Sequence, residues 1–90
     1  MDDTELLEHL FELARDAGLV VRIHGAGSAA DTGLASGVCR VRDEVWVVLS
    51  REEPASVHVD VLCQALRTEA GDFLEGRFVP PAVRDRIDAG

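Results

Sequence analysis

Two amphipathic helical patterns enclose three short runs of branched apolar residues, and this order limits the folds open to the chain. Residues 4–17 and 54–70 repeat apolar side chains at helical spacing, whereas 19–24, 38–42 and 45–50 are rich in Val, Leu and Ile, as strands are. A chain of 90 residues has room for one core. We therefore predict one α+β domain over residues 1–90. It is a two-layer sandwich with a three-stranded, mainly antiparallel sheet on two helices, in the order α-β-β-β-α plus a short C-terminal helix.

The alternation of side chains along the strands assigns each residue to one of two sheet faces. Val21 and Ile23 share one face of the first strand, and Arg22 and His24 share the other. A hairpin turn at Asp43-Glu44 with an even-numbered loop puts the last two strands in a defined register, which a three-residue loop would change. The buried core is then predicted to contain the following side chains: Leu10, Val21, Trp46, Val48, Leu62 and Leu66.

The segment 25–37, GAGSAADTGLASG, contains small side chains with the exception of Leu34. This composition predicts a flexible loop. The segment opens with a G-x-G-x-x-A pattern directly after a strand, which is one feature of dinucleotide-binding units. The rest of such a unit is missing, because no crossover helix follows the pattern. We predict no cofactor-binding residues.

The charge balance argues against several classes of partner. Seventeen acidic residues against nine Arg and no Lys give a net charge of −8. This sign disfavours nucleic acid and anionic membranes as partners. Two explanations for the acidity and the absent Lys stay open: a GC-rich genome, and halophilic adaptation, in which an acidic surface stays hydrated in salt. No basic, apolar leader and no membrane-length apolar run is present, so we expect a cytoplasmic protein.

Metal-binding and catalytic residues are not predicted. The candidate ligands are His9, His24, His58, Cys39 and Cys63, and they form neither an H-E-x-x-H nor a C-x-x-C motif. Both cysteines are expected to be reduced thiols buried in apolar surroundings, where a thiol reacts slowly. The sequence therefore favours a protein without catalytic activity.

One predicted sheet face combines basic and aliphatic side chains, and we predict that it is an interface. With the hairpin described above, this face carries Arg22, His24, Arg40, Arg42, Val45, Val47 and Leu49. Arginines around aliphatic residues are typical of protein interfaces. Three alternatives stay open for what covers the face: a second copy in a homodimer, an acidic protein partner, or the chain's own tail from Phe78 onward.

The second half of the chain resembles short uncharacterised bacterial proteins of unknown function. The similarity rests on a G-x-C hairpin at 37–41, the amphipathic helix containing Val61-Leu62-Cys63, and a P-P-x-V-R tail at 80–84. It implies no activity. The order of hairpin and helix also resembles the core of zinc-peptidase domains, but His58-Val59-Asp60-Val61-Leu62 stands where such domains have H-E-x-x-H. The resemblance therefore implies no metal site.

These patterns together predict a small acidic protein that acts by self-association or by binding another protein, without catalysis. The alternative function is a small enzyme or a ligand-binding accessory protein that uses the 25–37 loop. An enzyme of this kind needs a concave pocket with convergent polar groups beside that loop.

Overall fold

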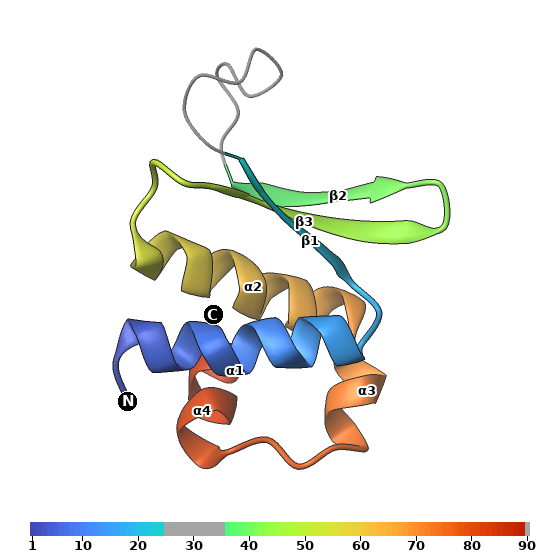
Figure 1. Cartoon of the computed structure of the whole chain (residues 1–90). Helices are drawn as coiled ribbons and strands as arrows, with labels where there is room; N and C mark the ends of the chain where they lie inside the picture. The colour runs from blue at the N-terminus through green and yellow to red at the C-terminus, as the bar shows by residue number, and fades with distance from the viewer. Residues whose placement is uncertain (25–35, 90) are drawn as a thin grey trace.

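The computed structural model describes residues 1–24 and 36–89 of the chain (Figure 1). The elements follow the predicted order: α1 (Asp3–Asp16), β1 (Val20–His24), β2 (Gly37–Val41), β3 (Glu44–Ser50), α2 (Ala55–Glu69), α3 (Gly71–Glu75) and α4 (Pro81–Ala89). The α+β class and the C-terminal helix are confirmed. The short helix α3 is an additional element that the predicted order does not contain. The segment 25–35, which contains most of the predicted flexible loop, lies outside the described residues.

Both ends of α1 are closed by local hydrogen bonds. At the start, the Asp2 side chain accepts a bond of 2.9 Å from the backbone N–H of Glu5, so Asp2 is the N-cap. At the end, Gly18 adopts a φ of +87°. The N–H of Leu19 reaches back to the Ala14 carbonyl at 2.9 Å. This Schellman arrangement needs a left-handed residue, which glycine adopts without strain.

The three strands form a mixed sheet in the order β1-β3-β2. β2 and β3 pair antiparallel, as predicted for a hairpin, but β1 pairs parallel with β3. The expectation of a mainly antiparallel sheet therefore holds for one of the two strand pairs. β1 and β2 lie on opposite sides of β3, so residues 25–36 join two strands that are not neighbours.

The hairpin turn lies one residue earlier than predicted. Val41 pairs with Glu44, so the two loop residues are Arg42 and Asp43, and Arg42 has a positive φ of 58°. The register also pairs Cys39 with Trp46 and Arg40 with Val45. The residues that share each face of the hairpin are nevertheless those that an even-numbered loop predicts, because the register moves by two positions.

Helices α1 and α2 cover one face of the sheet (Figure 1). On this face, the β3 side chains of Val47 and Leu49 are fully buried, together with Leu10 of α1 and Leu62 and Leu66 of α2. The predicted burial of the three helical leucines is confirmed. The predicted burial of Trp46 and Val48 was wrong, since both are half-buried, and Val21 is half-buried as well. On the hairpin the helices pack on the face opposite to the one we expected, whereas on β1 they cover the side of Val21, as expected.

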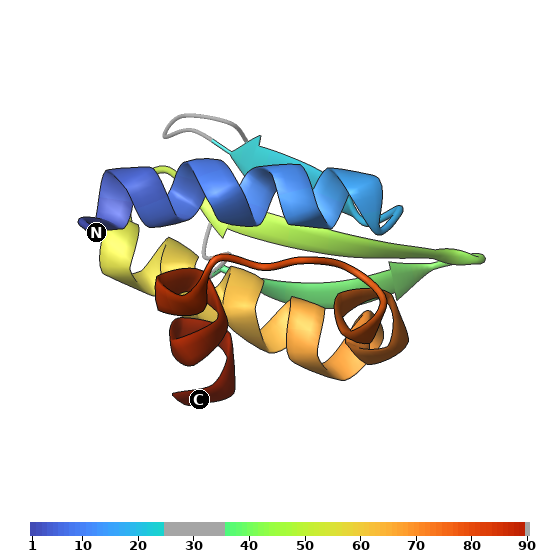
Figure 2. The same ribbon diagram turned by 90° about the horizontal axis from the view of Figure 1, so that it is seen from below.

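The C-terminal segment packs against the helices and not against the sheet. Viewed from below, α4 lies across α2 (Figure 2). Val83 and Ile87 are buried there, and the Arg86 guanidinium reaches the Asp60 carboxylate at 2.7 Å. The tail from Phe78 onward, one of the three alternatives for what covers the predicted interface, therefore packs on the helices instead. No helix in residues 1–24 and 36–89 is both long enough and apolar enough to cross a membrane.

Candidate functional site

The structure separates the seven predicted interface residues. Val47 and Leu49 have no exposed surface, so the expectation that they lie on an open sheet face was wrong. Val45 is half-buried on the same side. Arg40 shares this side and donates a hydrogen bond of 3.1 Å to Glu69 at the end of α2. The expectation failed because α1 and α2 pack on this side of the hairpin, so its aliphatic side chains belong to the core.

The other predicted residues lie elsewhere in the sheet. Arg42 occupies the hairpin turn. Arg22 pairs with Val48, so it lies on the face opposite Val47. His24 pairs with Ser50 at the end of β1 and is half-buried. The parallel register of β1 therefore divides the basic residues between the two faces, although the sequence alone had grouped them on one.

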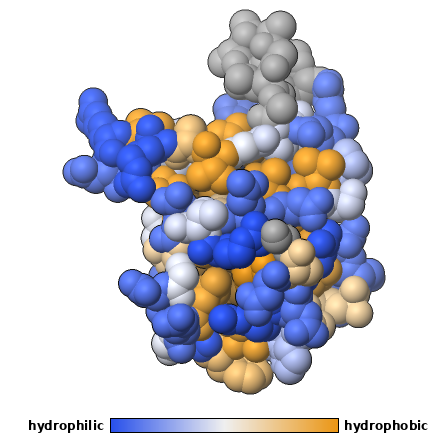
Figure 3. Space-filling model, turned by 180° about the vertical axis from the view of Figure 1, so that it is seen from behind, coloured by the Kyte–Doolittle hydropathy of each residue, from blue (hydrophilic) through white to orange (hydrophobic). Residues whose placement is uncertain are grey.

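The face of the sheet opposite α1 and α2 is covered by none of the described helices (Figure 1). We call it the uncovered face and define it by seven of the side chains that the register places there: Val20, Arg22, Cys39, Val41, Glu44, Trp46 and Val48; His24 and Ser50 follow at the end of the same face. Three of these seven are half-buried and the remaining four are exposed. Seen from behind, apolar residues reach the surface beside the polar tip of the hairpin (Figure 3). Strand alternation could have grouped these residues, but it does not show which group the helices cover.

An aromatic side chain with a cation above it lies in the middle of the uncovered face. The guanidinium carbon of Arg22 is 5.0 Å from the centre of the Trp46 ring, within the range of a cation–π interaction. The indole Nε1 of Trp46 has no hydrogen-bond partner among the described residues. This pair combines the two residue types that most often dominate the binding energy of protein interfaces.

The two cysteines differ in environment, and one of them departs from the prediction. Cys63 is buried in the core, and burial raises the pKa of its thiol. Cys39 was also expected to be buried, but its side chain is exposed beside Trp46. Because a buried thiol with a raised pKa reacts slowly, a thiol reagent distinguishes Cys39 from Cys63 in the folded chain.

A cluster of polar groups connects the end of the sheet to the start of α2. The backbone N–H of Ser36 donates to the Glu53 carboxylate at 2.6 Å, and the N–H of Ser50 donates to the Ser36 hydroxyl at 2.8 Å. His58 Nε2 donates to the carbonyl of Ser50 at 2.6 Å. The bond from the Ser36 backbone lowers the pKa of Glu53, and His58 lowers it further. These bonds fix the start of β2 next to β3.

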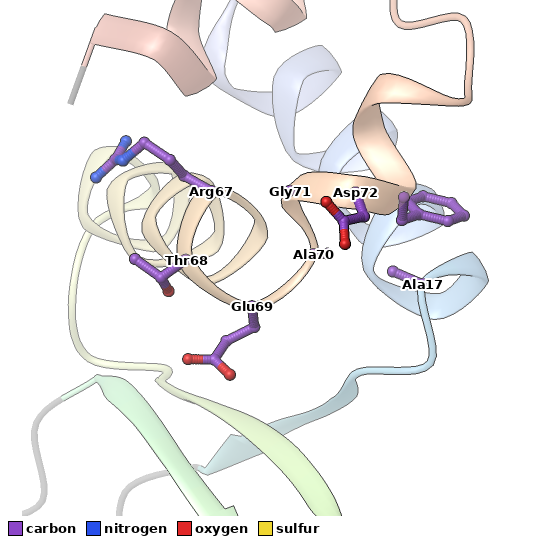
Figure 4. A pocket seen from close by; sticks show the side chains of 8 residues that line it. Ala17, Arg67, Thr68, Glu69, Ala70, Gly71 and Asp72 are labelled. Atoms are coloured by element: carbon purple, nitrogen blue, oxygen red, sulfur yellow. The ribbon is translucent and has the colours of Figure 1, made fainter.

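A shallow pocket of about 360 Å³ lies where α1 ends beside the junction of α2 and α3 (Figure 4). Its polar side chains point in different directions, and several are engaged in other contacts. Arg67 donates to the carbonyl of Ile87 at 2.7 Å, and Glu69 accepts the bond from Arg40. The Thr68 hydroxyl donates to the carbonyl of Gln64. The lining therefore stabilises the fold and does not converge on a ligand.

The structure also bears on the metal and nucleotide candidates of the sequence. Within residues 1–24 and 36–89, no group of three His, Cys, Asp or Glu side chains is arranged to hold a metal ion. The G-x-G-x-x-A pattern at 25–30 lies outside the described residues. No protein family, curated protein or solved structure matches the chain. The uncovered face is therefore the part of the described structure on which we base a function.

Proposed function

We propose that the chain is a non-catalytic protein-binding module whose contact surface is the uncovered face of the sheet. The observation that carries this proposal is the contrast along β3. Val47 and Leu49 are fully buried, while Trp46 and Val48 on the other side remain half-buried. A strand that is apolar on both sides is typical of a sheet that is covered on both faces. In the described structure of the single chain, only one face has its covering layer.

The chemistry of the uncovered face supports a protein as the covering layer. Apolar surface left in water costs about 25 cal/mol per Å². Trp46, Val48 and Val20 supply such surface at the centre, and Arg22 adds a cation at the side. Interface centres are enriched in aromatic residues and arginine, and a polar rim surrounds them. The net charge of −8 disfavours nucleic acid and anionic lipid as the alternative occupants.

Thiol footprinting of Cys39 tests this proposal. We expect Cys39 to react quickly with a maleimide in the purified chain at high dilution, and to be protected in the cells that naturally produce the protein. Cys63 is the internal control, because it is buried in the folded chain whether or not the uncovered face is occupied. Equal reactivity of Cys39 in the cells and in the dilute chain would overturn the proposal.

A matched pair of variants tests whether the protection arises at this face. Val48→Glu places a charge at the centre of the uncovered face and is expected to restore the reactivity of Cys39 in cells. Glu52→Gln alters an exposed residue of the loop before α2 and is expected to leave the protection unchanged. Protection that survives Val48→Glu in a folded chain would show that another surface is responsible.

A further inference from the structure

The side chains of the uncovered face form three rows that run across the strands. Val20 and Cys39 both pair with Trp46, so these three residues form a central row. On one side of it, Arg22 and Gly37 both pair with Val48. On the other side, Glu44 pairs with Val41. The central row is uncharged, with a cation in the row on one side and a carboxylate in the row on the other.

We infer that the partner of the uncovered face is a second copy of this chain, related by a two-fold axis along the central row. This inference rests on the proposed function and names its partner. A two-fold axis in the interface makes each copy present the same surface to the other. With the axis along Val20, Trp46 and Cys39, the central row packs on itself. The Arg22 row of each copy then lies over the Glu44 row of the other.

The charges of the two rows complement each other under this symmetry. Arg22 lies on β1 and Glu44 on the neighbouring strand β3, about 4.8 Å away in the direction across the sheet. The arginine side chain spans this offset, so each Arg22 reaches the Glu44 carboxylate of the other copy. In the alternative dimer, the two-fold axis would run parallel to β3. Arg22 of one copy would then lie over Gly37 of the other, which offers no carboxylate. The charge pattern therefore selects the axis that crosses the strands.

The shapes of the two rows also complement each other. Val41 is 40% exposed and projects from one end of β2. Gly37 lies on the other side of the central row on the same strand, and a side-chain carbon added there would meet no atom of the described residues within 4 Å. The two-fold axis places the Val41 side chain of one copy in the space above Gly37 of the other. Both the charge and the shape of the face therefore fit a copy of itself.

Charge reversal and restoration provide the decisive experiment. We expect the wild-type chain to change from monomer to dimer between micromolar and millimolar concentration, measured by sedimentation equilibrium. Arg22→Glu and Glu44→Arg each bring like charges together in both symmetric pairs, which should weaken dimerisation by about tenfold or more. The double variant Arg22→Glu/Glu44→Arg restores the pairs and should recover the wild-type constant. Glu44→Arg also reduces the net negative charge, so weaker association of this variant cannot result from general repulsion.

Glu52→Arg is the matched control, because it makes the same charge change as Glu44→Arg at an exposed residue outside the uncovered face. It should not weaken the dimer.

A second variant tests the shape of the interface. Gly37→Val fills the space that Val41 of the other copy needs, and should abolish dimerisation without unfolding the single chain. A short bismaleimide should link the Cys39 thiols of two wild-type copies, since both lie on the axis.

Each outcome decides between the inference and the proposed function. A wild-type chain that stays monomeric at millimolar concentration overturns the inference. A dimer that is unaffected by Arg22→Glu, or that the double variant fails to restore, overturns it as well. If the purified chain is monomeric while Cys39 is protected in cells, the uncovered face binds a different protein and the proposed function survives. If Cys39 is unprotected in cells as well, both are wrong.

Discussion

Val47 and Val48 are adjacent in β3 and chemically identical, yet they lie on opposite faces of the sheet in different environments. Val47 has no exposed surface, because α1 and α2 cover its face. Val48 points to the uncovered face and is half-buried by its neighbours in the sheet. The difference shows that the apolar character of this strand exceeds what the single chain needs for its core. This surplus is the reason for proposing the uncovered face as a contact surface.

The first and largest prediction concerns the covered face. Leu49→Ala should destabilise the chain by about 2–5 kcal/mol, from the lost transfer free energy and from the cavity that remains. Leu49 is fully buried under the helices, so few of its contacts can relax. Urea denaturation of the dilute chain measures the effect. A midpoint equal to that of the wild type would contradict the assignment of this face to the core.

The second prediction compares the two valines directly. Val47→Ala should cost about 2 kcal/mol, because two methyl groups leave a closed core. Val48→Ala should cost less than about 1 kcal/mol in the dilute chain, where its side chain is partly in water. Raising the protein concentration should enlarge the effect of Val48→Ala and leave that of Val47→Ala unchanged. Similar costs at both positions under dilution would remove the distinction between the faces.

The third prediction concerns the cation above Trp46. Arg22→Ala should cost about 0.5–1 kcal/mol in the dilute chain, the range of an exposed cation–π contact. Trp46 is the one tryptophan of the chain, so its fluorescence reports on the uncovered face alone. We expect the emission to shift in Arg22→Ala, because the guanidinium no longer lies over the ring. Arg40→Ala, on the covered side, is the control and should leave the emission unchanged.

The order of the elements and the grouping of the hairpin residues on the two faces could be predicted from the sequence. Helical spacing located α1 and α2, and the short C-terminal helix predicted after them is α4. Alternation correctly grouped Arg40 with Val45, Val47 and Leu49. These features depend on short stretches of chain, where local spacing contains the information.

The covered side of the sheet could not be predicted in the same way. The β3 sequence, EVWVVLS, is apolar on both faces, so its alternation does not distinguish the side of Val47 from the side of Val48. The parallel pairing of β1 with β3 also depends on contacts between distant residues, and it moved Arg22 to the face opposite Val47. The hairpin residues of the candidate site were consequently predicted on the wrong side of the sheet. Arg22 and His24 of β1 are the predicted basic residues that the register places on the uncovered face.

The smallest predicted effect concerns β2, which carries Cys39 and Val41 on the uncovered face. Burial stabilises the covered face, but most residues of β2 are exposed. Hydrogen bonds of Ser36 with Glu53 and Ser50 fix the start of β2 instead. The Ser36 backbone N–H holds the pKa of Glu53 below its ordinary value of 4.5. A carboxyl whose pKa is lowered by folding stabilises the folded state above its unfolded pKa, and the contribution is lost as the pH falls through the folded pKa. We therefore expect β2 to loosen in acid before the core does.

Hydrogen exchange of the β2 amides, expressed as protection factors, tests this expectation. In the wild type, protection of β2 should fall below about pH 4.5 while that of β3 persists. Glu53→Gln mimics the protonated carboxyl, so at neutral pH its β2 protection should already be reduced, and acid should change it little. Glu52→Gln, at the neighbouring exposed residue, should follow the wild type. If the amides of β2 and β3 lose protection at the same pH, the bonds from Ser36 do not stabilise β2 separately, and burial alone stabilises the sheet.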